Sequence, residues 1–166
     1  MVMLGSGVVR HRPCSAGGRR LGGAVKPLTM STQLSFRLAG PARPIILVPT
    51  FVNGRGPYEF ALDTGAAVTV LSPELAAALG LTSAEAREGM GAGGKIQVGI
   101  TSIQSLAVGT AGIENLQAAI ADLSGIGKAA GVRLDGIIGH NYLRHFVVTI
   151  DYPACSLRLD SKRQES

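Results

Sequence analysis

The chain has 166 residues, of which 46% are hydrophobic and only 4% aromatic, so it suits one domain with an aliphatic core. Its 23 glycines indicate many turns and favour a small β-rich domain over a helical bundle. The net charge of +5 belongs to residues 1–44, which hold seven basic residues and no acidic one. Since neither interleaved aromatic residues nor a recognition motif accompany these charges, the composition argues against a nucleic-acid partner.

The chain is expected to contain three regions. Residues 1–40 read as a basic, disordered N-terminal extension, residues 41–160 as the folded domain, and residues 161–166 as a C-terminal tail. No stretch reaches the roughly 18 apolar residues of a transmembrane helix, so no membrane partner is expected. The N-terminal apolar stretches are short and broken by Arg, Gly and Pro, which is not typical of a signal peptide and favours the cytoplasm.

The first half of the domain is predicted to contain strands followed by a helix. Runs rich in β-branched and aromatic residues indicate strands at residues 33–38, 45–52, 58–62 and 68–71. Asn53-Gly54 between two of them is a strong hairpin-turn dipeptide. Ser72 before Pro73 is a good helix N-cap, and Gly80 is a typical helix end.

The second half is predicted to add further short strands. Strand-like runs occur at residues 95–100, 103–108, 116–121, 146–151 and 156–159. Residues 82–88 predict one helical turn, residues 89–94 are the most glycine-dense stretch, residues 124–131 predict a small-residue loop, and residues 141–145 predict a short helix. Many short strands with one or two short helices predict an all-β fold, a small closed barrel.

One carboxylate interrupts an otherwise apolar run. Asp63 lies in FALDTGAAVTVL, where a predicted strand runs into a turn. Burying an ionised acid without a partner is costly, so this position requires a partner. The triplet Asp63-Thr64-Gly65 alone is a weak signal, but a small residue and another strand follow it. Downstream, Leu134–Gly139 supplies two bulky apolar residues followed by glycine.

These motifs, taken in order, resemble the retropepsin-like aspartic proteases, in particular the single-domain bacterial and retroviral type. The resemblance covers residues 45–159 and comprises a strand hairpin, FALDTGA, the helix SPELAAALG, the glycine-rich GMGAGG, DGIIGHNYL and the closing strand VVTIDY. It implies an aspartic endopeptidase that acts on peptide or protein substrates and has the acid-protease fold of one lobe. No metal and no organic cofactor are implied.

The resemblance also assigns roles to particular residues. Asp63 would be catalytic, and the active-site loop would comprise Thr64, Gly65 and Ala66. A flap over the substrate would comprise Met90, Gly91, Ala92, Gly93 and Gly94. The pocket and its supporting loop would comprise Val68, Ile137, Ile138 and Gly139. Ala67 replaces a polar residue common in retroviral members, so substrate contacts there are expected to differ. His140 stands where those members often carry Arg, so the ion pair that this Arg would make is not expected.

The glycine-rich stretch also fits a second pattern. Gly89, Gly91 and Gly94 match G-x-G-x-x-G, the dinucleotide-binding fingerprint, which requires a strand before it and a helix after it. Here a helical turn is predicted before the stretch and a strand after it, which is the reverse order, so the sequence does not support a dinucleotide-binding site. A flexible surface loop remains the alternative to the flap.

An aspartic protease needs a second carboxylate, for which the sequence offers two sources. Asp135, also followed by glycine, would form an internal pair with Asp63. A symmetric homodimer would instead bring together Asp63 from each of two chains. The dimer is favoured because the chain has the length, and the Asp-Thr-Gly triplet, of one lobe only. The alternative function is a non-catalytic dimeric peptide-binding module with the same fold, against which the retained triplet argues.

Overall fold

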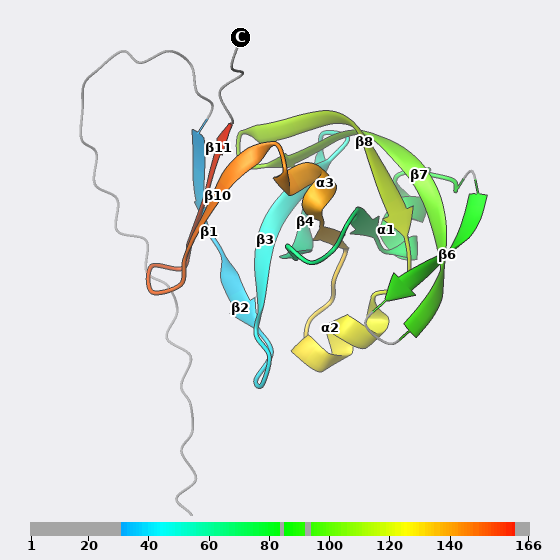
Figure 1. The fold of residues 1–166 in the computed structure, drawn as a ribbon, viewed down its shortest axis with the longest axis horizontal. Coiled ribbons are helices and arrows are strands. Elements are labelled where there is room, and N and C mark those ends of the chain that lie inside the picture. The colour runs from blue at the N-terminus through cyan, green and yellow to red at the C-terminus, as the bar shows by residue number, and fades with distance from the viewer. Residues whose placement is uncertain (1–30, 84, 92–93, 162–166) are drawn as a thin grey trace, which may run out of the picture.

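The computed structural model describes residues 31–83, 85–91 and 94–161. In these residues it contains the following strands and helices, shown in Figure 1: β1 (Ser31–Ser35), β2 (Arg37–Ala39), β3 (Ile45–Val52), β4 (Arg55–Leu62), β5 (Thr69–Leu71), α1 (Pro73–Ala78), β6 (Glu85–Gly91), β7 (Gly94–Val108), β8 (Ala111–Ile120), α2 (Ser124–Ala130), β9 (Gly136–Ile138), α3 (His140–Leu143), β10 (Phe146–Asp151) and β11 (Ser156–Ser161).

The strands of the larger sheet close into a barrel. The order of this sheet is β2-β3-β4-β9-β5-β8-β7-β6, and an additional pairing joins β3 to β7, so the strands from β3 round to β7 form a ring (Figure 1). A separate antiparallel sheet of order β1-β11-β10 lies beside the ring. The predicted all-β fold with a small closed barrel is confirmed.

The core has two parts because several strands are buried on both faces. Alternate residues of a strand point to opposite faces, and in β4 Phe60 enters the main core while Ala61 enters a second, smaller cluster. In β9, Ile138 and Ile137 divide in the same way. The second cluster also contains Ala130 of α2, so this helix contributes to covering the outer face of the barrel.

The local signals of the first half are confirmed. Asn53 and Gly54 both have positive φ angles (50° and 71°), as a two-residue hairpin turn between β3 and β4 requires. The Ser72 hydroxyl caps α1 by accepting a hydrogen bond from the Leu75 amide (3.1 Å). Gly80, just beyond the helix, has a φ of 68°.

Two expectations for the second half are wrong. Residues 124–131, predicted as a loop, form α2, which begins where the Asp122 carboxylate accepts hydrogen bonds from the Ser124 amide and hydroxyl (2.8 and 2.9 Å). The helical turn predicted within residues 82–88 is absent from residues 85–88, which belong to β6 and pair with β7. The strands predicted at 95–100 and 103–108 are one continuous strand, β7.

The folded domain begins before its predicted boundary at residue 41. Residues 31–39 form β1 and β2, which pair with β11 and β3 respectively. Residues 1–30 and 162–166, assigned to the extension and the tail, lie outside the described residues. No helix within the described ranges combines the length and the apolar character needed to cross a membrane.

Candidate active site

Asp63 begins the loop that joins β4 to β5, and β9 lies between these two strands. β9 runs parallel to β4, with Leu62 opposite Ile138, and antiparallel to β5, with Val70 opposite Ile137. Asp63 therefore follows directly beyond the point where β9 ends. The close approach of β9 to β4 depends on Gly136, where an added Cβ would lie 2.3 Å from the Phe60 ring.

Backbone hydrogen bonds tie this loop to the segment between β9 and α3. The Asp63 amide donates to the Ile138 carbonyl oxygen (3.1 Å). At the far end of the loop, the His140 amide donates to the Ala66 carbonyl oxygen (2.7 Å). The Asn141 amide donates to the Ala67 carbonyl oxygen (3.2 Å). Both ends of the loop are thus fixed to one neighbouring segment, which gives Asp63 a defined position.

The Asp63 carboxylate is oriented by its own loop. Its Oδ1 accepts a hydrogen bond from the Gly65 amide (2.8 Å), and a Cβ at position 65 would lie 3.2 Å from that oxygen. Asp63, Thr64 and Gly65 are all exposed in the single chain. Among the described residues, the Thr64 hydroxyl has no hydrogen-bond partner. A single chain therefore does not bury the Asp63 carboxylate, and the desolvation cost that the sequence predicted does not arise in it.

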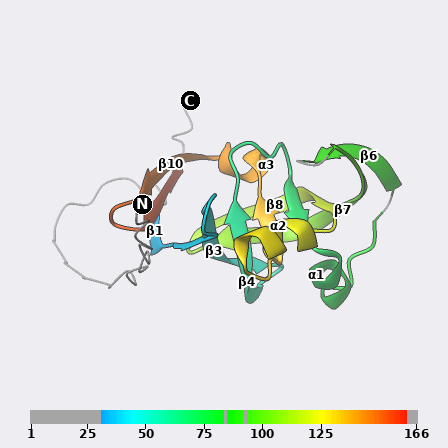
Figure 2. The same cartoon turned by 90° about the horizontal axis from the view of Figure 1, so that it is seen from below.

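The remaining predicted site residues lie in two regions, one next to the Asp63 loop and one in the β6–β7 hairpin. Ala66 and Val68 are half-buried, while Ile137, Ile138 and Gly139 are buried beneath the loop. The predicted flap residues Met90 and Gly91 belong to β6 and Gly94 to β7, and Gly91 pairs with Gly94 at the end of this hairpin. Ala92 and Gly93 lie outside the described residues. Figure 2 shows β6 and α3 on one side of the molecule and α1 on the other.

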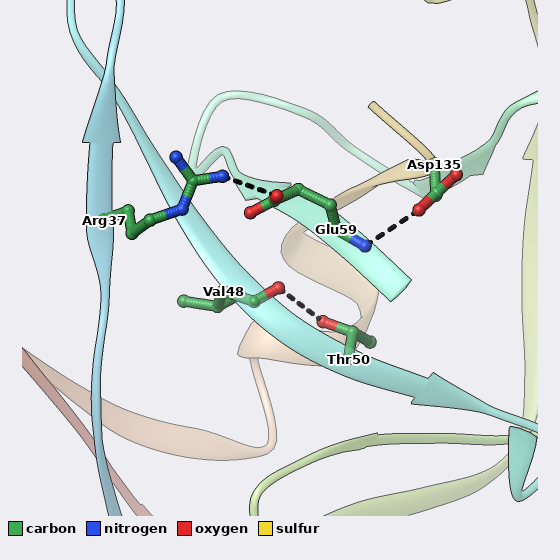
Figure 3. A network of polar contacts seen from close by, with 5 residues as sticks. All are labelled: Arg37, Val48, Thr50, Glu59 and Asp135. Atoms are coloured by element: carbon green, nitrogen blue, oxygen red, sulfur yellow. Dashed lines mark hydrogen bonds and ion pairs between the residues drawn. The ribbon is translucent and has the colours of Figure 1, made fainter. Parts of the chain in front are cut away.

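Asp135 lies at the opposite end of β9 from Asp63. Its Oδ2 accepts a hydrogen bond from the Glu59 amide (2.9 Å), and its own amide donates to the Glu59 carbonyl oxygen (2.9 Å), as Figure 3 shows for the first of these bonds. The Arg133 guanidinium lies 3.3 Å from its Oδ1, and Arg37 pairs with the Glu59 side chain. Asp135 is bonded to Glu59, which precedes Asp63 by four residues along the strand, so Glu59 and Asp63 lie roughly 13 Å apart. An internal Asp63–Asp135 pair is excluded.

The sequence did not single out two polar residues that the structure places beneath the loop. Asn141 Oδ1 accepts hydrogen bonds from the Thr69 amide (2.8 Å) and the Thr69 hydroxyl (3.0 Å). Asn141 is 72 residues from Thr69, so no local pattern connects them. The only available signal was a threonine inside an apolar strand, which needs a hydrogen-bond partner when buried.

The described residues also contain two surface hollows, but no metal cluster. Within the described ranges, no three His, Cys, Asp or Glu side chains lie together as a metal site would require. Two surface hollows, of about 440 and 590 Å³, lie beside α1 and α2. Asp63 lines neither hollow, and the Ser124 hydroxyl that donates to Asp122 in the second one belongs to the start of α2.

Comparison with known proteins gives two kinds of similarity. The sequence model of a family described as Aspartyl protease matches residues 48–142, more than half of the chain. The fold is similar to the crystal structure of a retropepsin-like aspartic protease from Rickettsia conorii, with a TM-score of 0.53 and 19% identity, over 83% of this chain and 97% of that chain. EIAV protease complexed with the inhibitor HBY-793 gives a TM-score of 0.44 and 20% identity, over 60% and 86% of the two chains.

A search of curated protein sequences gives no significant match. The family match includes Asp63, its loop, the β6–β7 hairpin and the β9–α3 segment beneath the loop. The similarity to the Rickettsia structure supports the fold. The chain therefore belongs to the aspartyl protease family and has the retropepsin-like fold.

Proposed function

We propose that this protein is an aspartic endopeptidase that hydrolyses peptide bonds as a homodimer, with Asp63 of each protomer in a shared catalytic dyad. The observation that carries the proposal is the presentation of Asp63. Its loop is fixed at both ends and its carboxylate is oriented by the Gly65 amide, yet the side chain is exposed. A rigidly held, uncovered carboxylate in this family suits a site that a second chain completes.

Two-fold symmetry supplies the second carboxylate. In a symmetric dimer, a residue at the axis meets its own copy. Asp135, which the sequence offered as an internal partner, is engaged by the Glu59 amide at the other end of β9. The exposed Thr64 and Gly65 would be covered in the same contact. Dimerisation is then a condition of catalysis, because each chain provides half of the dyad.

The chemistry follows from two carboxylates at close range. Like charges about 3 Å apart cannot both ionise, so the pair shares one proton. The ionised member removes a proton from a bound water molecule, whose oxygen attacks the scissile carbonyl carbon, while the protonated member donates its proton to the carbonyl oxygen. The dyad then gives a proton to the leaving nitrogen and takes one from a hydroxyl of the tetrahedral intermediate, which breaks the C–N bond and restores the shared proton. The Gly65 amide holds one Asp63 oxygen and leaves the other for this exchange.

The β6–β7 hairpin would cover the substrate. It extends from the edge of the barrel and ends in the glycine pair Gly91 and Gly94. An extended peptide beneath two such hairpins would bind through main-chain hydrogen bonds, with side chains alternating between opposite pockets. Mobile hairpins that close over a substrate also exclude bulk water from the reaction.

Substitution of Asp63 tests the proposal. Asp63→Asn should abolish cleavage of a peptide library, measured by mass spectrometry over an acidic-to-neutral pH series, while leaving the fold and the dimer mass unchanged. Asp122→Asn is a matched control, because Asp122 is also exposed and its Oδ1 also accepts the amide two residues later, from Ser124 (2.8 Å). The control should cleave normally.

Two results would count against catalysis by Asp63, and a third would count against the shared dyad. Cleavage by Asp63→Asn at the wild-type rate would refute the assignment. Peptide binding without cleavage by the wild-type protein, in a dimer, would support the alternative of a non-catalytic binding module. Full activity in a strict monomer, shown by light scattering, would refute the shared dyad.

A further inference from the structure

The side chain of Asn141 joins three segments that are far apart in sequence. Its Oδ1 accepts hydrogen bonds from the backbone amide (2.8 Å) and the hydroxyl (3.0 Å) of Thr69 at the start of β5. Its Nδ2 donates to the Gln117 carbonyl oxygen of β8 (2.7 Å). One carboxamide in α3 therefore holds two strands of the barrel through every polar atom that it possesses.

The Thr69 hydroxyl extends this network to Gly139, the residue between β9 and α3. Thr69 is fully buried, and its hydroxyl both donates to Asn141 and accepts from the Gly139 amide (3.3 Å). Among the described residues, no buried side-chain nitrogen or oxygen lacks a hydrogen-bond partner. Removing the Thr69 hydroxyl would consequently leave the Gly139 amide without its acceptor, which is costly in a buried position.

The same segment carries the Asp63 loop. Residues 138–141 supply the carbonyl oxygen that accepts the Asp63 amide and the amides that donate to Ala66 and Ala67. Gly139 also lies so close to the loop that a Cβ there would be 2.4 Å from the Val68 backbone. The position of Asp63 therefore depends on where residues 138–141 are held relative to β5. The pairing of β9 with β5 ends at Ile137, and beyond it the bonds between Asn141 and Thr69 hold this segment to the start of β5.

We propose that Asn141 and Thr69, here called the Asn141–Thr69 clamp, are positioning residues that set the distance between the two Asp63 carboxylates. This inference rests on the proposed function. Neither residue touches the reacting atoms. Because symmetry repeats any displacement in both protomers, a small shift of the loop acts twice on the dyad. A misplacement of about 1 Å costs on the order of 100-fold in rate.

The test compares three threonine variants by steady-state cleavage of a peptide substrate. Thr69→Val removes the hydroxyl at nearly constant volume, and Thr69→Ser restores it. The matched control is Thr50→Val, because Thr50 is also fully buried but its hydroxyl donates only to the Val48 carbonyl oxygen of its own strand (3.3 Å; Figure 3). We expect Thr69→Val to lower kcat by roughly 10- to 100-fold with KM within about twofold, Thr69→Ser to recover most of kcat, and Thr50→Val to leave kcat unchanged.

Hydrogen exchange measures the clamp independently of catalysis. The Asp63 amide should exchange at least roughly tenfold faster in Thr69→Val than in wild type, and at the wild-type rate in Thr69→Ser and Thr50→Val. If Thr69→Val does not fold, Asn141→Ala carries the test, because it removes the acceptor of both Thr69 hydrogen bonds. A reduced kcat and faster exchange of the Asp63 amide are expected there too.

Two patterns of results separate this inference from the proposed function. Wild-type kcat and wild-type exchange of the Asp63 amide in the clamp variants would overturn the clamp, while Asp63→Asn could still be inactive. Normal cleavage by Asp63→Asn would overturn the proposed function, whereas the exchange measurement would still decide whether the clamp holds the loop.

Discussion

Gly139→Ala should disrupt the active-site loop through steric contact alone. Gly139 has an extended backbone conformation (φ −101°, ψ 179°), which alanine adopts freely, so no dihedral strain is expected. The new Cβ would lie 2.4 Å from the carbonyl carbon and oxygen of Val68 and 2.9 Å from the Thr69 nitrogen. These are backbone atoms, which cannot rotate away as a side chain can.

The size of the effect follows from these distances. Ordinary van der Waals contact begins at 3.4 Å, so the loop and the β9–α3 segment must separate by roughly 1 Å. Overpacking of this kind costs about 1–3 kcal/mol in the free energy of unfolding. If the same displacement reaches Asp63, kcat falls on the order of 100-fold.

Urea unfolding and peptide cleavage measure the two effects separately. Gly125→Ala is the matched control, because Gly125 is exposed in α2 and a Cβ there meets nothing within 4 Å. The control should be unchanged or stabilised by about 0.5–1 kcal/mol, since alanine favours a helix over glycine. Wild-type stability and wild-type kcat in Gly139→Ala would refute the close packing on which the description of the site depends.

Two further substitutions test the barrel. Tyr142→Phe removes the hydrogen bond from the buried hydroxyl to the Ala111 carbonyl oxygen (2.6 Å) and should cost about 1–2 kcal/mol by urea unfolding at neutral pH. Burial raises the pKa of Tyr142 above its ordinary value of 10.0, so its contribution to stability is present below pH 10 and is lost as pH rises toward the raised pKa. The difference in unfolding free energy between Tyr142→Phe and wild type should therefore shrink above pH 10. A constant difference would contradict this reasoning. Asn53→Gly keeps the turn but loses the Oδ1 acceptor of the Gln104 and Ser105 amides (2.8 and 3.1 Å), so thermal unfolding should show a loss of about 1–2 kcal/mol, and an unchanged Tm would contradict this role.

The parts of the fold that the sequence predicted have local causes. The turn at Asn53-Gly54 needs two positive φ angles, and α1 needs the Ser72 cap; both causes lie within a few residues of their effects. Helix α2 was missed because SGIGKAA has weak intrinsic helix propensity. Its Ala130 instead packs in the second cluster with Leu47 and Ala61, which are distant in sequence. Strand β6 was missed because its partner, β7, determines its conformation.

The residues of the site also divide into those with a local cause in the sequence and those that depend on distant partners. Asp63 could be predicted because its identity and its loop form a contiguous motif that resembles a known family. The Asn141–Thr69 clamp could not, because hydrogen bonds across 72 and 24 residues appear only after the barrel has closed. The exposure of Asp63 in one chain also needed the structure, since the surrounding apolar run suggested burial.

A subunit-mixing experiment tests the shared dyad most directly. Increasing amounts of Asp63→Asn are added to a fixed amount of wild-type protein, the chains are allowed to exchange, and peptide cleavage is measured. If each active site needs Asp63 from both chains, mixed dimers are inactive. Activity should then fall to about one half at equal amounts and to about one tenth at a ninefold excess. Activity that stays constant across the series would contradict a dyad formed between two chains.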